Sequence, residues 1–281
     1  MSNYRIVQSR QNSHIKELRQ AMARPGRSER GLVAIEGPNL IAEALRAGLR
    51  IDTLFVAEGA ESLAEELPIA SDIERLLLPE SLLTAALDTE SPQPIAALIE
   101  PPLWNPGDLL PPQGIEAPAP LYIVLAGLQD PGNVGTILRS AEAFGATGAL
   151  LLPGTVSPWN QKAIRASAGS IFRLPLMSAS AEELFPRLHQ AGIRIFTTAV
   201  EGATPAHRAA LDTPSAILIG NEGNGVPAEI AALADEAITI PCPGPVESLN
   251  ASIAASILLY EAATQRRKSV PANSDRKRNA Q

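Results

Sequence analysis

The chain is poor in the residues that form disulfides and bind structural metals. Its 281 residues include one cysteine, Cys242, and three histidines. A single cysteine cannot form an internal disulfide, and so few thiols and imidazoles argue against a structural zinc site. We therefore predict a cytoplasmic protein that needs no metal.

Long apolar stretches are also missing. No uncharged apolar run approaches the roughly 20 residues of a membrane-spanning helix. The stretch "MSNYRIVQSRQNSHIKELRQ" at the start of the sequence is charged and lacks the apolar core of a signal peptide. With 45% hydrophobic and 19% charged residues, the composition is that of a globular protein without a membrane segment.

The net charge of −7 hides an uneven distribution. Residues 1–30 hold seven Arg or Lys against two Glu, and residues 266–281 hold six against one Asp. Residues 51–120 hold thirteen Asp or Glu against Arg75 alone. Basic ends around an acidic middle indicate that part of the surface meets a polyanion, although solvated charge blocks explain the same pattern.

Two α/β patterns are separated by a proline-rich stretch, "PPLWNPGDLLPPQGIEAPAP". Strands that alternate with helices before and after it predict two α/β domains. A proline-rich segment without periodicity is typical of an extended linker. The predicted organisation is an N-terminal α/β domain at 1–100, a linker at 101–120, a second domain at 121–265 and a basic disordered tail at 266–281.

Within these domains the apolar spacing predicts individual elements. Residues 121–128, "LYIVLAGL", form a continuous apolar run that is typical of a strand buried on both faces. The helices expected from periodicity and stop signals cover residues 12–21, 38–47, 134–144, 157–168 and 181–191. "IFRLPLM" at 171–177 is expected to be a strand.

Three polar, glycine-bearing loops each follow an apolar strand, at 127–139, 220–227 and 241–250. In an open parallel sheet, ligands bind beyond the carboxyl ends of the strands, so the three loops could border one cleft. The first loop does not match a dinucleotide fingerprint, because its glycines are not spaced as G-x-G-x-x-G. A Walker-type phosphate loop is excluded as well, since G-K-[ST] is absent.

Each polar residue in these loops has a plain structural explanation beside a functional one. Arg139 could be an exposed helix arginine with a partly buried stem. Glu222, between glycines, could point into water or accept hydrogen bonds from a ligand or an arginine. Ser248 or Asn250 could cap the last helix, but two polar side chains around Leu249 exceed what one cap requires.

Taken together and in this order, the loops resemble the three motifs of the SpoU (TrmH-like) RNA 2′-O-ribose methyltransferases of the SPOUT superfamily. "DPGNVGTILRSAEAFGA" resembles the first motif, "IGNEGNGVP" the second and "IPCPGPVESLNASIAASILLYEA" the third. The N-terminal half is similar to the family's substrate-binding module in "SRQNSHIKELRQ", "EGPNLIAEALRAG" and "SPQPIAALI".

The resemblance implies an α/β fold in which the C-terminal parallel-sheet domain contains a trefoil knot and a smaller N-terminal α/β domain binds RNA. It also implies a homodimer with the active site at the subunit interface, and S-adenosylmethionine (the methyl donor) bound in the knot. The residues it assigns to catalysis are Asn133, Arg139, Glu222, Ser248 and Asn250. The residues it assigns to the donor are Gly220, Asn221, Ile240, Gly244 and Leu249, and those assigned to RNA are Arg10, Asn12, Lys16 and Arg19.

The predicted reaction transfers the sulfonium methyl group to a ribose 2′-hydroxyl without a metal, which requires alignment and removal of the hydroxyl proton. In the family, Arg139 is the candidate for handling that proton or a nearby phosphate. Because arginine is normally always protonated, we favour a positioning and electrostatic role. Cys242 stands where the family often has methionine, and Ala251 where valine is common.

Alternatives stay open for both the RNA substrate and the activity. The N-terminal domain favours 23S ribosomal RNA, while transfer RNA stays open, as does ribosomal methylation that confers antibiotic resistance. A non-catalytic RNA-binding protein of the same fold is the main rival. A nicotinamide-dependent oxidoreductase is disfavoured by the broken glycine fingerprint.

Overall fold

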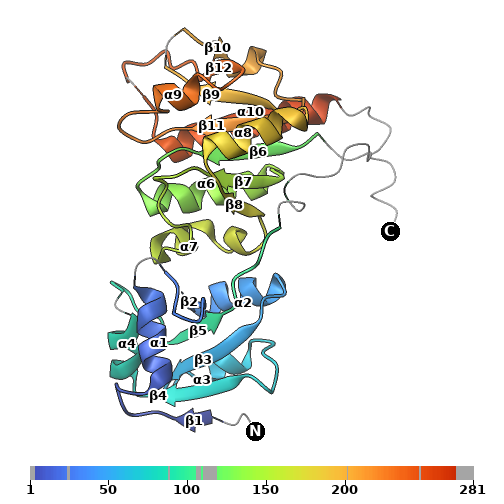
Figure 1. Cartoon of the computed structure of the whole chain (residues 1–281). Coiled ribbons are helices and arrows are strands. Elements are labelled where there is room, and N and C mark those ends of the chain that lie inside the picture. Colours follow the sequence, from blue (N-terminus) through green and yellow to red (C-terminus); the bar gives the residue numbers. More distant parts are fainter. Residues whose placement is uncertain are drawn as a thin grey trace, which may run out of the picture. The chain divides into compact units, whose positions relative to one another are not determined.

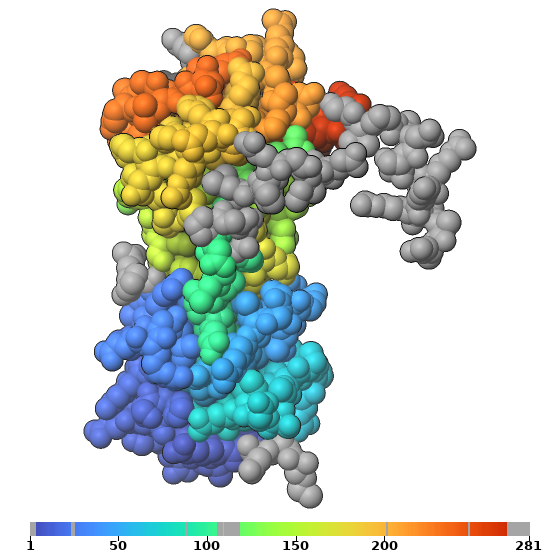
Figure 2. Space-filling view, turned by 45° about the vertical axis from the view of Figure 1, so that its right-hand side comes forward, coloured from blue at the N-terminus to red at the C-terminus, as the bar shows by residue number. Residues whose placement is uncertain are grey.

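The computed structural model describes residues 4–23, 26–87, 89–105, 109, 119–200, 202–246 and 248–269. The chain divides into two compact units (Figure 1; Figure 2 is a space-filling view in the same colours). Unit 1 comprises Met1–Leu103 with Ser157–Arg173, and unit 2 comprises Trp104–Val156 with Leu174–Gln281. Most of the predicted linker, and the tail beyond residue 269, lie outside the described residues.

Unit 1 is built on a mixed five-stranded sheet with the order β1-β4-β3-β5-β2. Strand β5 runs antiparallel to both of its neighbours, and all five of its residues are buried. The strands are β1 (Tyr4–Ile6), β2 (Val33–Glu36), β3 (Ile51–Ala57), β4 (Glu74–Leu78) and β5 (Ile95–Ile99). The helices are α1 (Ser13–Met22), α2 (Pro38–Arg46), α3 (Glu61–Glu65), α4 (Glu80–Leu87) and α7 (Gln161–Ser167).

The segment 157–173 belongs to unit 1, whereas the sequence assigned it to the second domain. Its polar contacts explain the difference. The Gln161 side chain donates to the carbonyl oxygen of Ala34 in β2 at 2.9 Å, and Arg173 forms an ion pair with Glu43 of α2. After α7, the 3₁₀ helix η1 (Ser170–Phe172) is fully buried. The expected strand at 171–177 is therefore wrong in its first half, and β8 covers only Leu176–Ser178.

Unit 2 contains a seven-stranded sheet whose paired strands all run parallel, in the order β10-β12-β9-β11-β6-β7-β8. The central strands β6 (Leu121–Leu125) and β11 (Ser215–Ile219) are buried along their whole length, as the apolar run in β6 predicted. The α/β class with a parallel sheet is therefore confirmed. The other strands are β7 (Gly148–Leu151), β9 (Arg194–Thr198), β10 (Thr204–Pro205) and β12 (Glu236–Thr239).

Four α-helices and one 3₁₀ helix of the described residues belong to unit 2. They are α6 (Pro131–Ala143), α8 (Ala181–Gln190), α9 (Ala228–Ala231), α10 (Ala251–Ser269) and η2 (Ala206–Arg208). Helix α6 starts three residues before its predicted start, because Asp130 caps it and Pro131 takes the first helical position, where a missing N–H costs nothing. Helix α10 continues past 265, so the expected domain end is too early.

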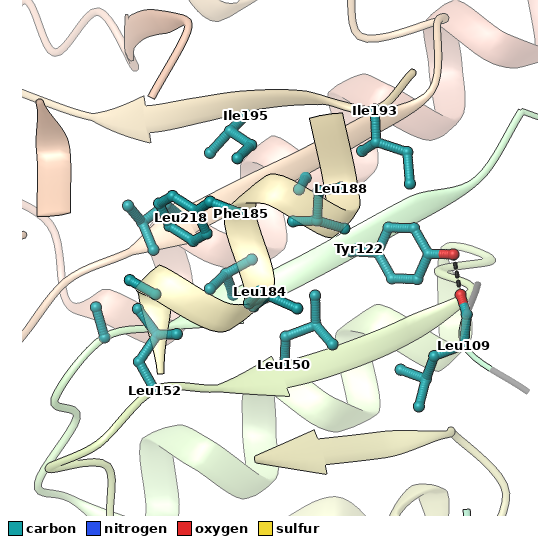
Figure 3. Packing of buried hydrophobic residues seen from close by; sticks show 14 residues of the cluster. Leu109, Tyr122, Leu150, Leu152, Leu184, Phe185, Leu188, Ile193, Ile195 and Leu218 are labelled. Carbon is teal, nitrogen blue, oxygen red and sulfur yellow. Dashed lines mark hydrogen bonds between the residues drawn. The ribbon is translucent and has the colours of Figure 1, made fainter. Parts of the chain in front are cut away.

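The core of unit 2 lies between the sheet and α8, where Leu184, Phe185 and Leu188 point into the cluster of buried side chains (Figure 3). Leu109, from the predicted linker, is fully buried in the same cluster, and the hydroxyl of Tyr122 donates to its carbonyl oxygen. Burial raises the pKa of Tyr122 to about 12. Part of the predicted linker is thus a packed piece of unit 2.

Among the described residues, no helix combines the length and the apolar character that crossing a lipid bilayer requires.

Candidate functional site

The candidate site of unit 2 lies at the carboxyl ends of four neighbouring strands, β12, β9, β11 and β6. Because these strands are parallel, the loops that follow them meet at one edge of the sheet, as predicted. A pocket of about 540 Å³ opens there, in the size range of small-molecule sites. Its walls come from residues 198–200, 219–225 and 238–242 and from residues between 246 and 258.

The loop after β11 is shaped by close backbone contact. A Cβ atom on Gly220 would lie 2.1 Å from the carbonyl carbon of Gly225, so no other residue fits there without moving the backbone. Asn221 and Gly225 exchange two backbone hydrogen bonds of 2.9 Å across this turn, and Gly225 has a positive φ of 68°. The glycines therefore fold the loop tightly at one wall of the pocket.

Asn221 ties this loop to the loop after β6. Its side-chain oxygen accepts from the backbone N–H groups of Gly223 and Asn224. Its amide nitrogen donates to the carbonyl oxygen of Gly127 at 2.8 Å. Asn221 lines the pocket as expected, but its amide is engaged in holding two loops together.

Glu222 is the centre of the polar contacts between the loops. Its carboxylate accepts hydrogen bonds from the Asn133 amide at 2.9 Å and from the backbone N–H groups of Gln129 at 3.2 Å and Asp130 at 3.3 Å. Asn133 in turn accepts at 3.1 Å from the amide of Asn250. Three residues that are separated by 89 and 117 positions in sequence thus form one chain of hydrogen bonds.

The direction of this chain is fixed by chemistry. An ionised carboxylate only accepts, so the Asn133 amide nitrogen must face Glu222 and its oxygen must face Asn250. The Asn250 oxygen then accepts from the backbone N–H groups of Ser252 at 2.9 Å and Ile253 at 3.3 Å, which makes Asn250 the N-cap of α10. The cap and the polar cluster are therefore one structure.

The hydrogen bonds to Glu222 also shift the pKa of its carboxyl group. Partial burial alone raises the pKa of this carboxyl, but the hydrogen bonds from Asn133 and from the backbone outweigh it, and the pKa is lowered from its ordinary value. Glu222 therefore stabilises the fold above the ordinary glutamate pKa, and this contribution is lost as the pH falls through the lowered pKa.

Ser248, Leu249, Gly220 and Ile240 line the pocket as the sequence predicted. Ser248 is exposed and takes no part in the helix cap, which Asn250 forms alone. Gly244 does not line the pocket, and a Cβ on it would meet open space, so the structure does not bring it to the pocket.

Arg139 lies apart from the polar cluster. It is exposed on α6, and no hydrogen bond or ion pair links it to Glu222, Asn133 or Asn250 among the described residues. The buried face of α6 carries its neighbours Ile137, Leu138 and Ala141, and partial burial of the Arg139 stem stays a prediction.

The residues predicted to bind RNA lie at α1 of unit 1. Arg10 and Lys16 are exposed and Arg19 is half-buried. Asn12 is the N-cap of α1, since its side chain accepts from the backbone N–H of His14 at 2.9 Å. Its amide therefore has a structural task besides any contact with RNA.

Several residues of the site carry no signal that was recognised in the sequence. Gln129 and Asp130 hold Glu222 through their backbone, and the Asp130 side chain caps α6. The hydroxyl of Thr155 accepts from the N–H of Gly127 and donates to the carbonyl oxygen of Leu125, which fixes the first loop from the side of β7. Backbone contacts of this kind depend on tertiary structure and leave no mark on residue type.

In the part of the chain that the structure describes, no group of three or more His, Cys, Asp or Glu side chains is arranged to hold a metal ion.

The sequence matches two known families. Residues 120–260 match the SpoU rRNA Methylase family, and residues 12–97 match the MRM3-like substrate binding domain. The chain is 30% identical over 258 residues to the 23S rRNA (guanosine(2553)-2'-O)-methyltransferase RlmP of Bacillus subtilis, covering 90% of this chain and 97% of the relative.

Solved structures share the fold. The SpoU methyltransferase AviRb from Streptomyces viridochromogenes, in complex with the cofactor AdoMet, aligns with a TM-score of 0.79 and 27% identity over 92% of this chain and 99% of that one. The AdoMet-bound rRNA methyltransferase from Sinorhizobium meliloti aligns with a TM-score of 0.80 and 29% identity over 95% and 99%.

We expect Asn133→Ala to raise the pKa of Glu222 toward its ordinary value, because the variant removes a side-chain donor to the carboxylate. A carbon-detected NMR titration of the glutamate carboxyls would measure the change. Asn224→Ala is the matched control, since Asn224 lies in the same loop and its backbone, not its side chain, is bonded to Asn221. An unchanged Glu222 pKa in Asn133→Ala would contradict the hydrogen-bond chain.

Proposed function

Because this chain belongs to the SpoU rRNA methylase family, we propose that it transfers a methyl group from S-adenosylmethionine to a ribose 2′-hydroxyl of ribosomal RNA. One observation of the structure carries the proposal. The loops after β6, β11 and β12 are joined by the Glu222–Asn133–Asn250 chain directly beside a pocket of about 540 Å³. The family motifs thus meet at one place.

The pocket suits the donor in size and in chemistry. Apolar side chains, among them Ile219, Ile240 and Leu249, alternate there with the backbone of the glycine loop. Such a lining can hold a flat aromatic ring against apolar walls while backbone groups bind its polar edge. We propose Gly220, Ile240 and Leu249 as contacts of the donor, and Asn221 as the residue that keeps their loop in place.

The bound donor supplies an activated methyl group on a sulfonium ion. The carbon–oxygen bond forms as the carbon–sulfur bond breaks, and the hydroxyl proton leaves to a base or to water. The protein must hold the oxygen in line with the methyl carbon and the sulfur. Ser248 lines the pocket from the third loop and Asn250 donates to Asn133, and we propose that both position the ribose. Glu222, with several hydrogen bonds and a lowered pKa, acts as a positioning residue.

Arg139 is proposed to act on the ribose or a phosphate next to it from the exposed face of α6. Its pairing with a phosphate would use the planar guanidinium fork, which lysine lacks.

We expect Arg139→Lys to lower the turnover of methyl transfer by about a hundredfold, the usual effect of losing one preorganised hydrogen-bond donor, with little change in RNA affinity because lysine keeps the positive charge. Transfer of labelled methyl groups to ribosomal RNA, followed by nucleoside mass spectrometry for 2′-O-methylation, measures it. Arg187→Lys on the exposed face of α8 is the control. Wild-type turnover in Arg139→Lys would show that the fork is not needed, and no transfer by the wild type to any RNA would contradict the proposed function.

Ribosomal RNA is favoured over transfer RNA by the extent of the similarity. The matches cover both units, including a substrate binding domain at residues 12–97, and the B. subtilis relative is named for 23S rRNA. We propose Arg10, just before α1, and Lys16 and Arg19 on α1 as contacts to the RNA backbone, because phosphate contacts are made largely by such side chains. We also propose that the protein is located in the cytoplasm.

A homodimer is proposed from an apolar stripe on α10. Ile253, Ile257 and Tyr260 are 53%, 40% and 58% exposed and recur at helical spacing. Exposed apolar stripes of this kind mark interaction surfaces. Helix α10 packs against α6 through the Ser140–Ser256 hydrogen bond. Arg139 is exposed on α6, so a second subunit on this surface would bring it to a shared active site.

We expect the wild-type chain to sediment at twice its mass of 29.6 kDa and Ile257→Asp to sediment as a monomer, because a buried unpaired carboxylate is costly. Analytical ultracentrifugation measures both masses. Leu233→Asp places the same charge on an apolar residue of unit 2 that is 44% exposed but not part of the stripe, and it should leave the dimer intact. A monomeric wild type, or a dimeric Ile257→Asp variant, would rule out this interface.

The single cysteine gives a direct probe of the donor pocket. Cys242 is exposed and lines the pocket, so a thiol-alkylating reagent should label the chain once. We expect saturating S-adenosylhomocysteine to slow this labelling several-fold, measured by intact-mass spectrometry. The urea-unfolded chain is the control, where the compound should have no effect. Equal labelling rates with and without bound compound in the folded chain would place the donor elsewhere.

A further inference from the structure

Unit 1 contains a cavity of its own, of about 960 Å³. Its walls come from the end of α1, the junction of β2 and α2, the loop after α4 and the start of α7. No residue lines both this cavity and the pocket of unit 2. Gly37, with a positive φ of 88°, shapes one wall, because a Cβ there would come within 3.2 Å of the Gln93 side chain. The methyl-transfer site uses none of these residues.

A buried carboxylate lies at the wall of this cavity. The Glu36 side chain is only 3% exposed, yet Glu36 is among the lining residues. One of its oxygens accepts from the Thr89 hydroxyl at 3.2 Å, and the other lies 3.6 Å from the Arg165 guanidinium, which is longer than a hydrogen bond. Among the described residues, that second oxygen has no hydrogen-bond donor.

A buried Glu36 carboxylate with one unbonded oxygen is unfavourable in free energy unless a ligand supplies a hydrogen-bond donor to that oxygen. A buried carboxylate is normally held by several hydrogen bonds, because burial without them is unfavourable. Burial raises the pKa of Glu36, and Arg165 and Thr89 oppose that rise only in part. A ligand that offers N–H groups would supply the missing donors and stabilise the charged carboxylate.

The remaining lining defines the class of ligand. Among the described lining residues there are two cations, Lys162 and Arg165, and two carboxylates, Glu36 and Glu90, so the described lining has no excess of positive charge for a phosphate alone. Carboxamide and hydroxyl side chains are interspersed with apolar ones such as Leu87. A neutral aromatic heterocycle with hydrogen-bonding edges fits such a mixed surface.

We propose that this cavity binds one unpaired guanine base of the RNA substrate, with the guanine N1–H and N2–H groups donating to Glu36. The inference rests on the proposed function for the presence of RNA. The base in this cavity is a recognition contact in unit 1, distinct from the nucleotide that is methylated at unit 2.

Guanine is singled out by its donors. Its Watson–Crick edge presents two adjacent N–H groups, which match the two oxygens of a carboxylate. Adenine presents a ring nitrogen that accepts, which a carboxylate repels, and uracil presents one N–H between two carbonyl oxygens. Single-stranded RNA is commonly read by hydrogen bonds to this edge. Arg165, with a 44% exposed side chain, is placed to meet the attached phosphate.

The wild-type chain provides the first test. With the unit 2 pocket saturated by S-adenosylhomocysteine, GMP, IMP and AMP are titrated into the full-length protein and binding is followed by NMR. IMP differs from GMP only by the missing N2 amino group, so we expect it to bind about tenfold more weakly, and AMP more weakly still. Equal binding of all three would show phosphate recognition, and no binding at millimolar concentrations would show no site; either result overturns the proposal.

Glu36→Gln localises the effect, because it keeps the shape of the side chain and replaces one acceptor by a donor. We expect the preference for GMP over IMP to disappear and the KM for RNA in methyl transfer to rise about tenfold, with a much smaller effect on kcat. Glu65→Gln, on the exposed end of α3 in the same unit, is the matched control and should match the wild type.

The outcomes separate this proposal from the proposed function. If the wild type methylates RNA while Glu36→Gln keeps both its KM and its nucleotide preference, the guanine site is refuted and the methyltransferase assignment stands. If the wild type discriminates GMP from IMP but transfers no methyl group to RNA, the proposed function fails and the cavity is still a guanine site. Thermal melts check that both variants are folded. If Glu36→Gln does not fold, the titration of the wild type with GMP, IMP and AMP tests the guanine site by itself.

Discussion

The site of unit 2 depends on one chain of hydrogen bonds, from Asn133 to Glu222 and from Asn250 to Asn133. Because a carboxylate only accepts, Glu222 sets the direction of both amides, and the last amide oxygen in the chain is left to cap α10. Loop placement and helix initiation are thereby coupled. A change at any of these side chains would disturb the pocket wall and the start of the last helix together.

The parallel sheet makes this chain possible. Strands β12, β9, β11 and β6 are neighbours with the same direction, so loops more than a hundred residues apart in sequence emerge at one edge. In the loop after β11, the backbone of Gly220 can lie close to the backbone of Gly225 because Gly220 carries no side chain. The parallel sheet brings the loops close together, and the hydrogen bonds of Glu222, Asn133 and Asn250 orient them.

The two units treat a carboxylate in opposite ways. Glu222 is exposed, accepts several hydrogen bonds and has a lowered pKa. Glu36 is almost fully buried, has one hydrogen bond among the described residues and a raised pKa. The first is satisfied by the protein itself, whereas the second has acceptor capacity that a ligand could use. This contrast in hydrogen bonding is the basis for proposing a ligand site at Glu36 and not at Glu222.

The sequence by itself determined the α/β class, the buried strand β6, the three loops and six of the residues that line the pocket, because these follow from apolar periodicity and from motif residues. Only the tertiary structure decided that Asn250 rather than Ser248 caps α10, that Arg139 lies exposed apart from the cluster, and that residues 157–173 pack with unit 1. The cavity at Glu36 was likewise not predicted by the spacing of residues in the sequence. Residue types fix what a side chain can donate or accept, but the partner it meets depends on contacts between segments that are distant along the chain.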